Sequence, residues 1–375
     1  MTAPTDWTLT HTGFVDTWTC DENDHLNVQF YWEHFAQGAA MLAALDGGSA
    51  RPWTSRHVRY LRELRRGAAT QVLSRRQSET RTVHHLHDMS DGSLSATAID
   101  TFDHSTACDD EAARGRSLPA EPVAFDGEGD VAARFVVEPR ECGVAGTLSD
   151  RGLIGRFSSG AANIWAFAGI GRDWLRANRR GTVVVEKKVT RLGPAPPAGT
   201  PIEIVSRAAR SGAKTVRFDS GVRDARDRTP IYAVAMTALL MDLDARRAVA
   251  LPHDLPALDH RTVYKIVPRA DWTAARAAGR FEGAPIDLAD GYIHLSTAAQ
   301  AAETLEKHFH GQRDLLLVSV SVPRTARSMR WEVSRGGALF PHLYAPLSME
   351  MVTGERPIAE RDDGGHTMPD LGARP

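Results

Sequence analysis

The chain has 375 residues, of which 42% are hydrophobic and 25% charged, and its formal net charge is −2 at pH 7. Since a domain holds on the order of 150 residues, this length indicates two or three domains. The composition is ordinary for a soluble globular protein, and the nearly neutral charge excludes an electrostatic footprint for nucleic acid or an anionic membrane.

The N-terminus and the cysteines predict a cytoplasmic protein. Residues 1–7 have neither a basic region nor an apolar core, and no stretch approaches the roughly eighteen apolar residues that span a bilayer. The three cysteines, Cys20, Cys108 and Cys142, are odd in number and lack metal-ligand spacing. A reducing compartment and no metal site are therefore expected.

A first strand is predicted at residues 8–20 and a buried helix after it. One apolar face recurs at steps of three and four through Tyr31, Phe35, Ala39, Leu42 and Leu45, and Gly47-Gly48 ends the helix. Asp21, Asn23 and His25 therefore stand in the turn before the helix, where free backbone N–H groups favour developing negative charge. That setting suits acyl chemistry, because an oxyanion needs donors already in place.

The segment Asp21-Glu22-Asn23-Asp24-His25-Leu26-Asn27, with Tyr31 four residues later, resembles the site motif of the hotdog-fold thioesterases, in the superfamily of 4-hydroxybenzoyl-CoA and acyl-carrier-protein thioesterases. It matches the D-x-N-x-H-V-N pattern of the plant acyl-carrier-protein thioesterases, with Leu26 in place of Val. It departs from the D-x-D-x-x-G-H-V-N-N-x-x-Y pattern of single-domain members at Thr19 and Asp24. Residues 56–67 resemble the strand that follows the central helix in this family.

The resemblance implies an acyl-thioester hydrolase with Asp21, Asn23 and His25 as catalytic residues. Asn27 and Tyr31 would then bind the substrate. Two alternatives remain: the motif is a loop that caps a helix, or Cys20 is a nucleophilic thiol. Alternation along a strand points Cys20 and Asp21 to opposite faces, which disfavours the thiol.

Further strands are predicted at residues 56–64, 68–78, 80–88 and 93–103, which gives an α+β unit. A linker at residues 104–130 precedes a second pass of the same pattern, with a strand near 132–137, a helix at 156–167 and strands at 182–190, 201–209, 213–223 and 231–242. Leu73-Ser74-Arg75 is echoed by Val205-Ser206-Arg207. We therefore predict two tandem hotdog units, at residues 1–125 and 126–255.

The second unit has a degenerate site. Residues 149–155 before its helix contain no His and no D-x-N-x-H pattern. Asp150 and Arg156 are candidates for groups that the second unit adds to the site, although a helix cap and a surface charge are the favoured explanations.

A third, smaller α+β domain is predicted at residues 260–356, followed by a disordered tail at 357–375. Residues 263–266, 291–297, 330–332 and 340–344 resemble four motifs of a bacterial family of unknown function that has been likened to the ADP-ribosyltransferases. A possible site, implied by this resemblance, comprises Lys265, which replaces the family's His, and His294, Ser296, Thr297, Glu332, His342 and Tyr344. NAD is the cofactor that the resemblance would bring, but no Gly-rich phosphate loop supports it.

The sequence thus predicts a thioesterase that acts on an acyl group carried by coenzyme A or an acyl carrier protein, needs no cofactor, and could form a homo-oligomer. A hotdog hydratase is disfavoured because its motif, D-x-N-P-x-H, puts His five residues after Asp and has a Pro after Asn. The other alternative is a non-catalytic acyl-binding protein in which the C-terminal domain carries the activity.

Overall fold

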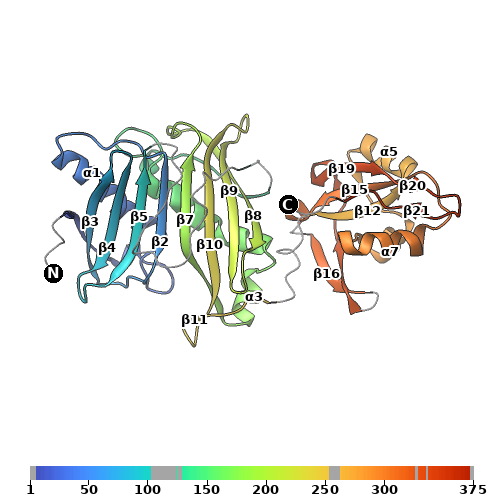
Figure 1. Cartoon of the computed structure of the whole chain (residues 1–375), viewed down its shortest axis with the longest axis horizontal. Helices are drawn as coiled ribbons and strands as arrows, with labels where there is room; N and C mark the ends of the chain where they lie inside the picture. Colours follow the sequence, from blue (N-terminus) through green and yellow to red (C-terminus); the bar gives the residue numbers. More distant parts are fainter. Residues whose placement is uncertain are drawn as a thin grey trace. The chain divides into compact units, whose positions relative to one another are not determined.

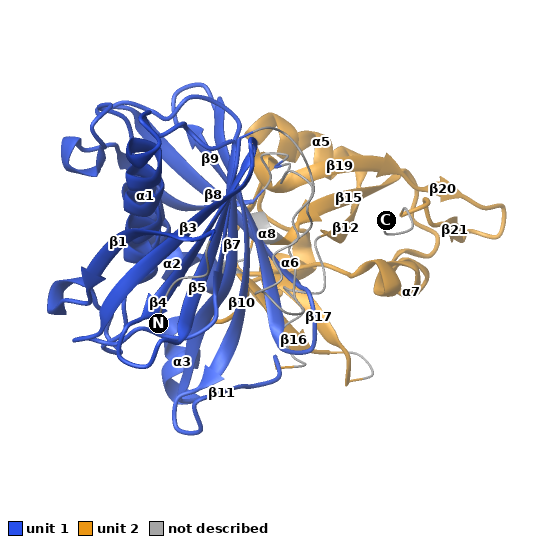
Figure 2. Cartoon of the chain, turned by 60° about the vertical axis from the view of Figure 1, so that its left-hand side comes forward, with its two compact units in different colours: residues 1–165, 171–251 blue, residues 166–170, 252–375 orange. Residues whose placement is uncertain are grey.

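The computed structural model describes residues 6–102, 125, 129–252, 262–325, 328–334 and 337–371. The chain divides into two compact units (Figure 2): unit 1 comprises residues 1–165 and 171–251, and unit 2 comprises residues 166–170 and 252–375. Both units mix helices and strands. No helix in the described part of the chain is long and apolar enough to cross a membrane. Most of the predicted linker and Cys108 lie outside the described residues.

Unit 1 contains one order of elements twice. The first repeat consists of β1 (Thr8–Phe14), η1 (Thr17–Thr19), α1 (Val28–Leu45), β2 (Ser55–Tyr60), β3 (Ala69–Ser78), β4 (Arg81–Asp88) and β5 (Leu94–Thr101). The second repeat consists of β6 (Asp130–Val136), η2 (Pro139–Glu141), α2 (Asp150–Phe167), β7 (Arg180–Arg191), β8 (Pro201–Arg210), β9 (Thr215–Asp224) and β10 (Pro230–Asp242). The short elements α3 (Arg172–Ala177) and β11 (Arg247–Ala248) are additions to this order that the sequence pattern did not predict.

The strands of both repeats form one sheet (Figure 1). Their order is β1-β3-β4-β5-β2-β7-β10-β9-β8-β6, so the second repeat continues the first in reverse, and β11 pairs with β10. The repeats meet where β2 pairs with β7 in antiparallel register, and the middle pair of that register is His57 opposite Lys188. Strands β1 and β6 form the two edges.

Helix α1 packs on β1, β3 and β4 through its apolar face (Figure 2). It begins at Val28 because the side chain of Asn27 accepts a hydrogen bond from the Gln29 N–H. It ends before Gly47, which takes the left-handed conformation with φ 76°. Its own side chains Trp32 and Phe35 are fully buried. The helix predicted from the apolar spacing is therefore present.

Helix α2 starts six residues earlier than predicted, at Asp150 rather than Arg156. Ser149 explains the earlier start, since its Oγ accepts a hydrogen bond from the Gly152 N–H at 3.1 Å and caps the first turn. The sequence pattern missed this turn because Gly152 and Gly155 are poor helix formers.

Arg56 and Lys187 take equivalent places in the two repeats. Each directly precedes a member of the central pair, His57 and Lys188. Arg56 lies opposite Asp100 of β5, whereas Lys187 lies opposite Met236 of β10. The second repeat thus keeps the buried cation and lacks its carboxylate.

Unit 2 contains several small sheets and helices. Its longer elements are β12 (Thr262–Pro268), α5 (Arg269–Ala278), α6 (Pro285–Asp290), α7 (Ala298–Phe309), β15 (Leu315–Ser321), β16 (Met329–Val333), β17 (Leu339–Leu343) and β19 (Val352–Pro357). Shorter ones are β13 (Arg280–Phe281), β14 (Ile293–His294), α8 (Val322–Thr325), β18 (Leu347–Ser348) and η4 (Met349–Met351). One sheet has the order β12-β15-β19 and another β14-β17-β16.

The end of the chain differs from the predicted disordered tail. In residues 357–371, β20 (Ala359–Glu360) pairs with β21 (His366–Thr367). The buried ring of His366 fixes this segment to unit 2, since its Nε2 lies 2.8 Å from the carbonyl oxygen of Gln312. Composition alone does not reveal such an anchor, because it lies 54 residues away along the chain.

Candidate active site

The turn before α1 is a closed loop held by its own backbone. Cys20 and Leu26 form a β-bridge across it. The Asp21 N–H donates to the His25 carbonyl at 2.8 Å, and the Asp24 N–H donates to the Asp21 carbonyl at 3.1 Å. Asp24 takes the left-handed conformation, with φ 64°, so that the chain can reverse. Asp21, Asn23 and His25 are thereby held within one tight turn.

The carboxylate of Asp21 is engaged through one oxygen. Its Oδ1 accepts hydrogen bonds from the backbone N–H groups of Asn23, at 2.9 Å, and His25, at 3.1 Å. The side chain of Asn23 is exposed and that of His25 is buried. One turn therefore carries an oriented carboxylate, an exposed amide side chain and a buried imidazole.

Glu63 joins this group from a distant part of the sequence. Its Oε2 lies 3.2 Å from Nε2 of His25. The segment after β2 is fixed to the loop by backbone hydrogen bonds from Leu26 to Leu64, at 2.8 Å, and from Arg66 to Asp24, at 3.2 Å. Glu63 was not among the predicted site residues, although it is the one carboxylate in the arginine-rich stretch of residues 56–66.

The two predicted substrate-binding residues already have partners within the protein. Asn27 caps α1 through its side chain. Tyr31 is buried, and its hydroxyl oxygen accepts a hydrogen bond from the Leu64 N–H at 3.1 Å. Burial raises the pKa of Tyr31 above its usual value. In this arrangement both side chains hold the loop and the following segment in place.

Cys20 has a structural contact that its counterpart in the second repeat shares. Its Sγ donates to the carbonyl oxygen of Asp16 at 3.3 Å, and Cys142 donates to that of Glu138 at 3.6 Å. Burial raises the pKa of the Cys20 thiol, and the nearby carboxylate of Asp24 raises it further. Both observations argue against a nucleophilic thiolate.

The turn before α2 repeats this loop. Cys142 and Leu148 form the matching bridge, the Gly143 N–H donates to the Thr147 carbonyl at 2.9 Å, and the Gly146 N–H donates to the Gly143 carbonyl at 2.9 Å. Gly146 has φ 71°, close to that of Asp24. The two loops therefore share one backbone hydrogen-bond pattern.

The side chains of the two loops differ at the positions that carry chemistry. Gly143, Ala145 and Thr147 stand where the first loop has Asp21, Asn23 and His25. The Leu148 N–H donates to the Pro196 carbonyl as the Leu26 N–H donates to the Leu64 carbonyl. Pro196 is therefore equivalent to Leu64, and Ala195 stands at the position of Glu63. The loop thus forms without any of the four polar side chains.

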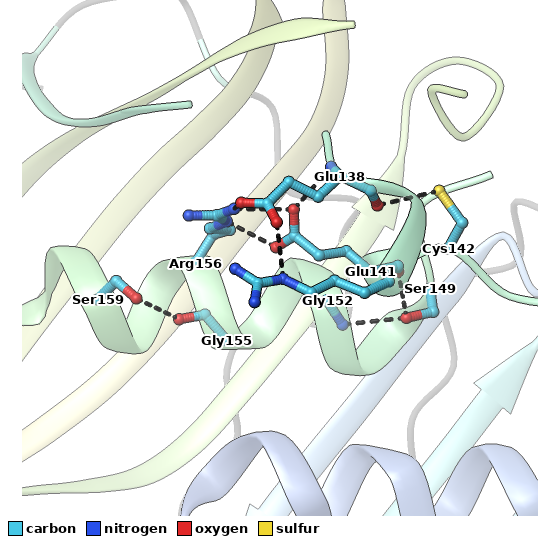
Figure 3. Close-up of polar contacts among 9 residues, drawn as sticks. Glu138, Glu141, Cys142, Ser149, Gly152, Gly155, Arg156 and Ser159 are labelled. Atoms are coloured by element: carbon cyan, nitrogen blue, oxygen red, sulfur yellow. Dashed lines mark hydrogen bonds and ion pairs between the residues drawn. The ribbon is translucent and has the colours of Figure 1, made fainter. Parts of the chain in front are cut away.

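Asp150 and Arg156, the candidates from the second unit, are both engaged in ion pairs. Oδ2 of Asp150 accepts hydrogen bonds from Arg56 Nη1, at 2.7 Å, and Trp53 Nε1, at 3.1 Å. Figure 3 shows Arg156 between two carboxylates, Glu141 at 2.6 Å and Glu138 at 3.2 Å. An open groove of about 410 Å³ lies beside Arg156, between α2 and β6.

In unit 2, Lys265 and His294 are joined through a buried carboxylate, Asp287. Nζ of Lys265 donates to Oδ2 of Asp287 at 2.6 Å, and Nδ1 of His294 lies 2.8 Å from Oδ1. Burial raises the pKa of Asp287, but the hydrogen bond from His294 and the charge of Lys265 outweigh it and bring the pKa to about 2. Burial lowers the pKa of Lys265.

Three further predicted residues form a second group. Oε2 of Glu332 lies 2.8 Å from Nδ1 of His342 and accepts a hydrogen bond from the Tyr344 hydroxyl, also at 2.8 Å. The hydrogen bond from His342 lowers the pKa of Glu332. The rings of His294 and His342 are 5.4 Å apart, so the two groups are neighbours.

Ser296 and Thr297 have structural contacts instead. The Ser296 hydroxyl donates to that of Thr304, and Thr297 caps α7 in a reciprocal arrangement with Gln300. Among the described residues there is no cluster of three or more side chains that could hold a metal ion.

Comparisons with known proteins find relatives for both units. Residues 137–258 match the thioesterase-like superfamily, and residues 266–355 match a family of proteins of unknown function (DUF952). The first match lies in the second repeat, which lacks the D-x-N-x-H pattern. No curated protein sequence matches the chain.

Three solved structures illustrate these similarities. Protein CC0527 from Caulobacter crescentus is 50% identical, with a match that covers 28% of this chain and 93% of CC0527 and a TM-score of 0.28. An acyl-ACP thioesterase from Bacteroides thetaiotaomicron is 8% identical, covering 64% of this chain and 100% of that one with a TM-score of 0.46. The 12:0-ACP thioesterase from Umbellularia californica is 9% identical, covering 61% and 92% with a TM-score of 0.42.

Proposed function

We propose that this chain, which contains a thioesterase-like superfamily domain and ends in a domain of the DUF952 family, hydrolyses acyl thioesters. Each repeat of unit 1 would be a hotdog unit, and the reaction would take place at the loop before α1. The acyl group would be carried by coenzyme A or by an acyl carrier protein. Hydrolysis of a thioester needs water and acid–base groups, so no cofactor is expected in unit 1.

The difference between the two loops carries this proposal. Both form the same backbone turn before a central helix, so the fold does not require Asp21, Asn23, His25 or Glu63. Only the first loop has these groups, and two of them, His25 and Glu63, are 38 residues apart in the sequence. Polar side chains that are dispensable for the turn, yet gathered in one place, favour a catalytic role.

In the proposed mechanism the thioester carbonyl lies near the N-terminus of α1, where the positive end of the helix dipole stabilises the oxyanion. Asp21 takes a proton from a water molecule that Asn23 orients, and the water oxygen bonds to the acyl carbon. The carbon–sulfur bond then breaks, and His25 delivers a proton to the leaving thiolate. Glu63, whose Oε2 lies 3.2 Å from Nε2 of His25, helps to position the imidazole.

Thiol release from a graded series of acyl-CoA thioesters tests the proposal on the full chain. Asp21→Asn and His25→Gln should each lower kcat by about 100-fold or more, the usual contribution of a general acid or base. Glu63→Gln should have a smaller effect, since the amide can still contact the imidazole.

Thr147→Val is the matched control, because Thr147 takes the place of His25 in the second loop. It should leave turnover unchanged. If the wild-type protein binds acyl-CoA and releases no thiol, unit 1 is an acyl-binding protein. Turnover that Asp21→Asn leaves intact would remove Asp21 from the mechanism.

A further inference from the structure

One face of the small sheet β14-β17-β16 in unit 2 gathers groups that can transfer protons. In its antiparallel register His342 lies opposite His294 on one side and opposite Arg330 on the other. Residues directly opposite each other point to the same face, with Cα atoms about 4.5–5.5 Å apart. Arg330, His342 and His294 therefore form one row across the three strands.

The two imidazoles of this row have different surroundings. His342 contacts the carboxylate of Glu332 through Nδ1, so that Nδ1 carries the proton and Nε2 of the neutral ring is an acceptor. His294 lies between two carboxylates, with Nδ1 2.8 Å from Asp287 and Nε2 3.2 Å from Asp290. A proton on Nε2 of His294 would therefore lie beside the carboxylate of Asp290.

Part of this face is reachable from solvent. The side chains of His294, Glu332 and Asp290 are 36%, 38% and 40% exposed, whereas that of His342 is 7% exposed. The Asp290 carboxylate can therefore swing away from the Nε2 of His294 and leave it to another acceptor. Lys265 and Asp287 lie behind the face, where Lys265 offsets the charge of the carboxylate that orients His294.

We propose that this row is a second active site, independent of the thioesterase, that hydrolyses phosphate diesters. Arg330, which is exposed above the ring of Tyr344, binds the phosphate oxygens, as a planar guanidinium does well. Nε2 of His342 takes a proton from water, whose oxygen bonds to phosphorus. The bond from phosphorus to the leaving oxygen breaks, and Nε2 of His294 gives that oxygen its proton.

The pairing of a base and an acid within one row suits a diester. The attacking and the leaving oxygen lie on opposite sides of phosphorus, so the reaction needs two proton-transfer groups and a cation between or beside them. The rings of His342 and His294 have centroids 5.4 Å apart, so the two proton-transfer groups are direct neighbours. Tyr292 stacks on His342 at 4.2 Å and covers the row from one side.

The experiment uses the full chain with two diesters, bis(4-nitrophenyl) phosphate and uridine 2′,3′-cyclic phosphate. The wild-type protein should hydrolyse at least one of them. His342→Gln and His294→Gln should lower kcat by about 100-fold, and Arg330→Gln should mainly raise KM, by about 10-fold. His310→Gln, at an exposed histidine after α7, is the matched control and should not change the rate.

Circular dichroism shows whether the His342→Gln variant, at a buried position, is folded. If that variant is unfolded, Arg330→Gln still tests the site, because Arg330 is exposed. The proposal is overturned if the wild-type protein cleaves neither diester. It is also overturned if His342→Gln, His294→Gln and Arg330→Gln all cleave at the wild-type rate. Release of nicotinamide from NAD without diester cleavage also overturns it. Asp21→Asn should leave diester cleavage unchanged, which separates this site from the thioesterase.

Discussion

Arg56 and Lys187 are equivalent buried cations, yet only Arg56 has a carboxylate to pair with. Arg56 forms two hydrogen bonds with Asp100, at 2.6 and 2.7 Å, and a third with Asp150. Nζ of Lys187 lies 5.1 Å above the ring of Phe157, and no ion pair joins it to another described residue. The first repeat thus pairs its buried cation with carboxylates, whereas the second places it over an aromatic ring. The two arrangements predict different effects of substitution on the free energy of unfolding.

Replacing Arg56 should destabilise unit 1 strongly. Arg56→Met leaves the buried carboxylate of Asp100 with only Nε2 of His84, 3.4 Å away, beside it, and loss of the buried ion pair costs about 3–5 kcal/mol of unfolding free energy. Urea denaturation at pH 7 measures the loss. Arg62→Met is the control, because the Arg62–Asp91 pair is exposed and contributes about 1 kcal/mol or less. Similar losses in the two variants would contradict the role of the buried pair.

Replacing Lys187 should instead stabilise the protein, in a manner that depends on pH. Burial lowers the pKa of Lys187 from 10.5 to about 8, which corresponds to about 3 kcal/mol. The unfolded chain binds this proton more tightly, so the cost to folding is complete below pH 8 and disappears as the pH rises past 10.5. Lys187→Met should therefore raise the unfolding free energy at pH 7, with a smaller gain at pH 10.

Urea denaturation of the wild-type protein and the Lys187→Met variant at both pH values measures this gain. Other groups titrate in the same range, but they are common to both proteins and cancel in the difference. A gain of the same size at pH 7 and pH 10 would mean that the lost charge is not its cause.

Asp24→Gly should stabilise the first loop. Asp24 has φ 64°, a conformation that costs a residue with a Cβ about 1 kcal/mol, and the second loop already has Gly146 at this place. The exposed ion pair between Asp24 and Arg66 offsets little of the gain. The melting temperature should rise for Asp24→Gly and not for Asp24→Ala. A fall for both would show that the carboxylate of Asp24 supports the loop.

Cys20→Ser should leave thioester hydrolysis within about threefold of the wild-type rate, since a hydroxyl can donate to the Asp16 carbonyl as the thiol does. Cys142→Ser in the second loop is the matched control. Thiol release from acyl-CoA measures both. A loss of about 100-fold in Cys20→Ser alone would restore the nucleophilic thiol as a candidate.

The strands of unit 1 could be predicted because alternation and turn residues mark them locally. The region before Arg156 could not, because Gly152 and Gly155 hide a turn of helix that depends on the cap at Ser149. Asp21, Asn23 and His25 were found as one motif since they are adjacent in sequence. The contact of Glu63 with His25 requires the segment after β2 to dock on the loop, and no local pattern encodes that.

The same holds for unit 2. His294, Glu332 and His342 were found through family motifs, whereas Asp287 was not, because it comes from a short helix outside those motifs. Ser296 and Thr297 belong to the motif, but their side chains support the start of α7. A motif thus predicts which residues are neighbours in sequence and leaves open which of them face one another.

The pairing of β2 with β7 lies within a single chain. Two separate copies that met at such a junction would dissociate on dilution, and every substitution would appear on both sides of it. Here the meeting of the two repeats is intramolecular, so its equilibrium does not depend on protein concentration. Each side can also change alone, as where the second loop has Gly143, Ala145 and Thr147 at the positions of Asp21, Asn23 and His25.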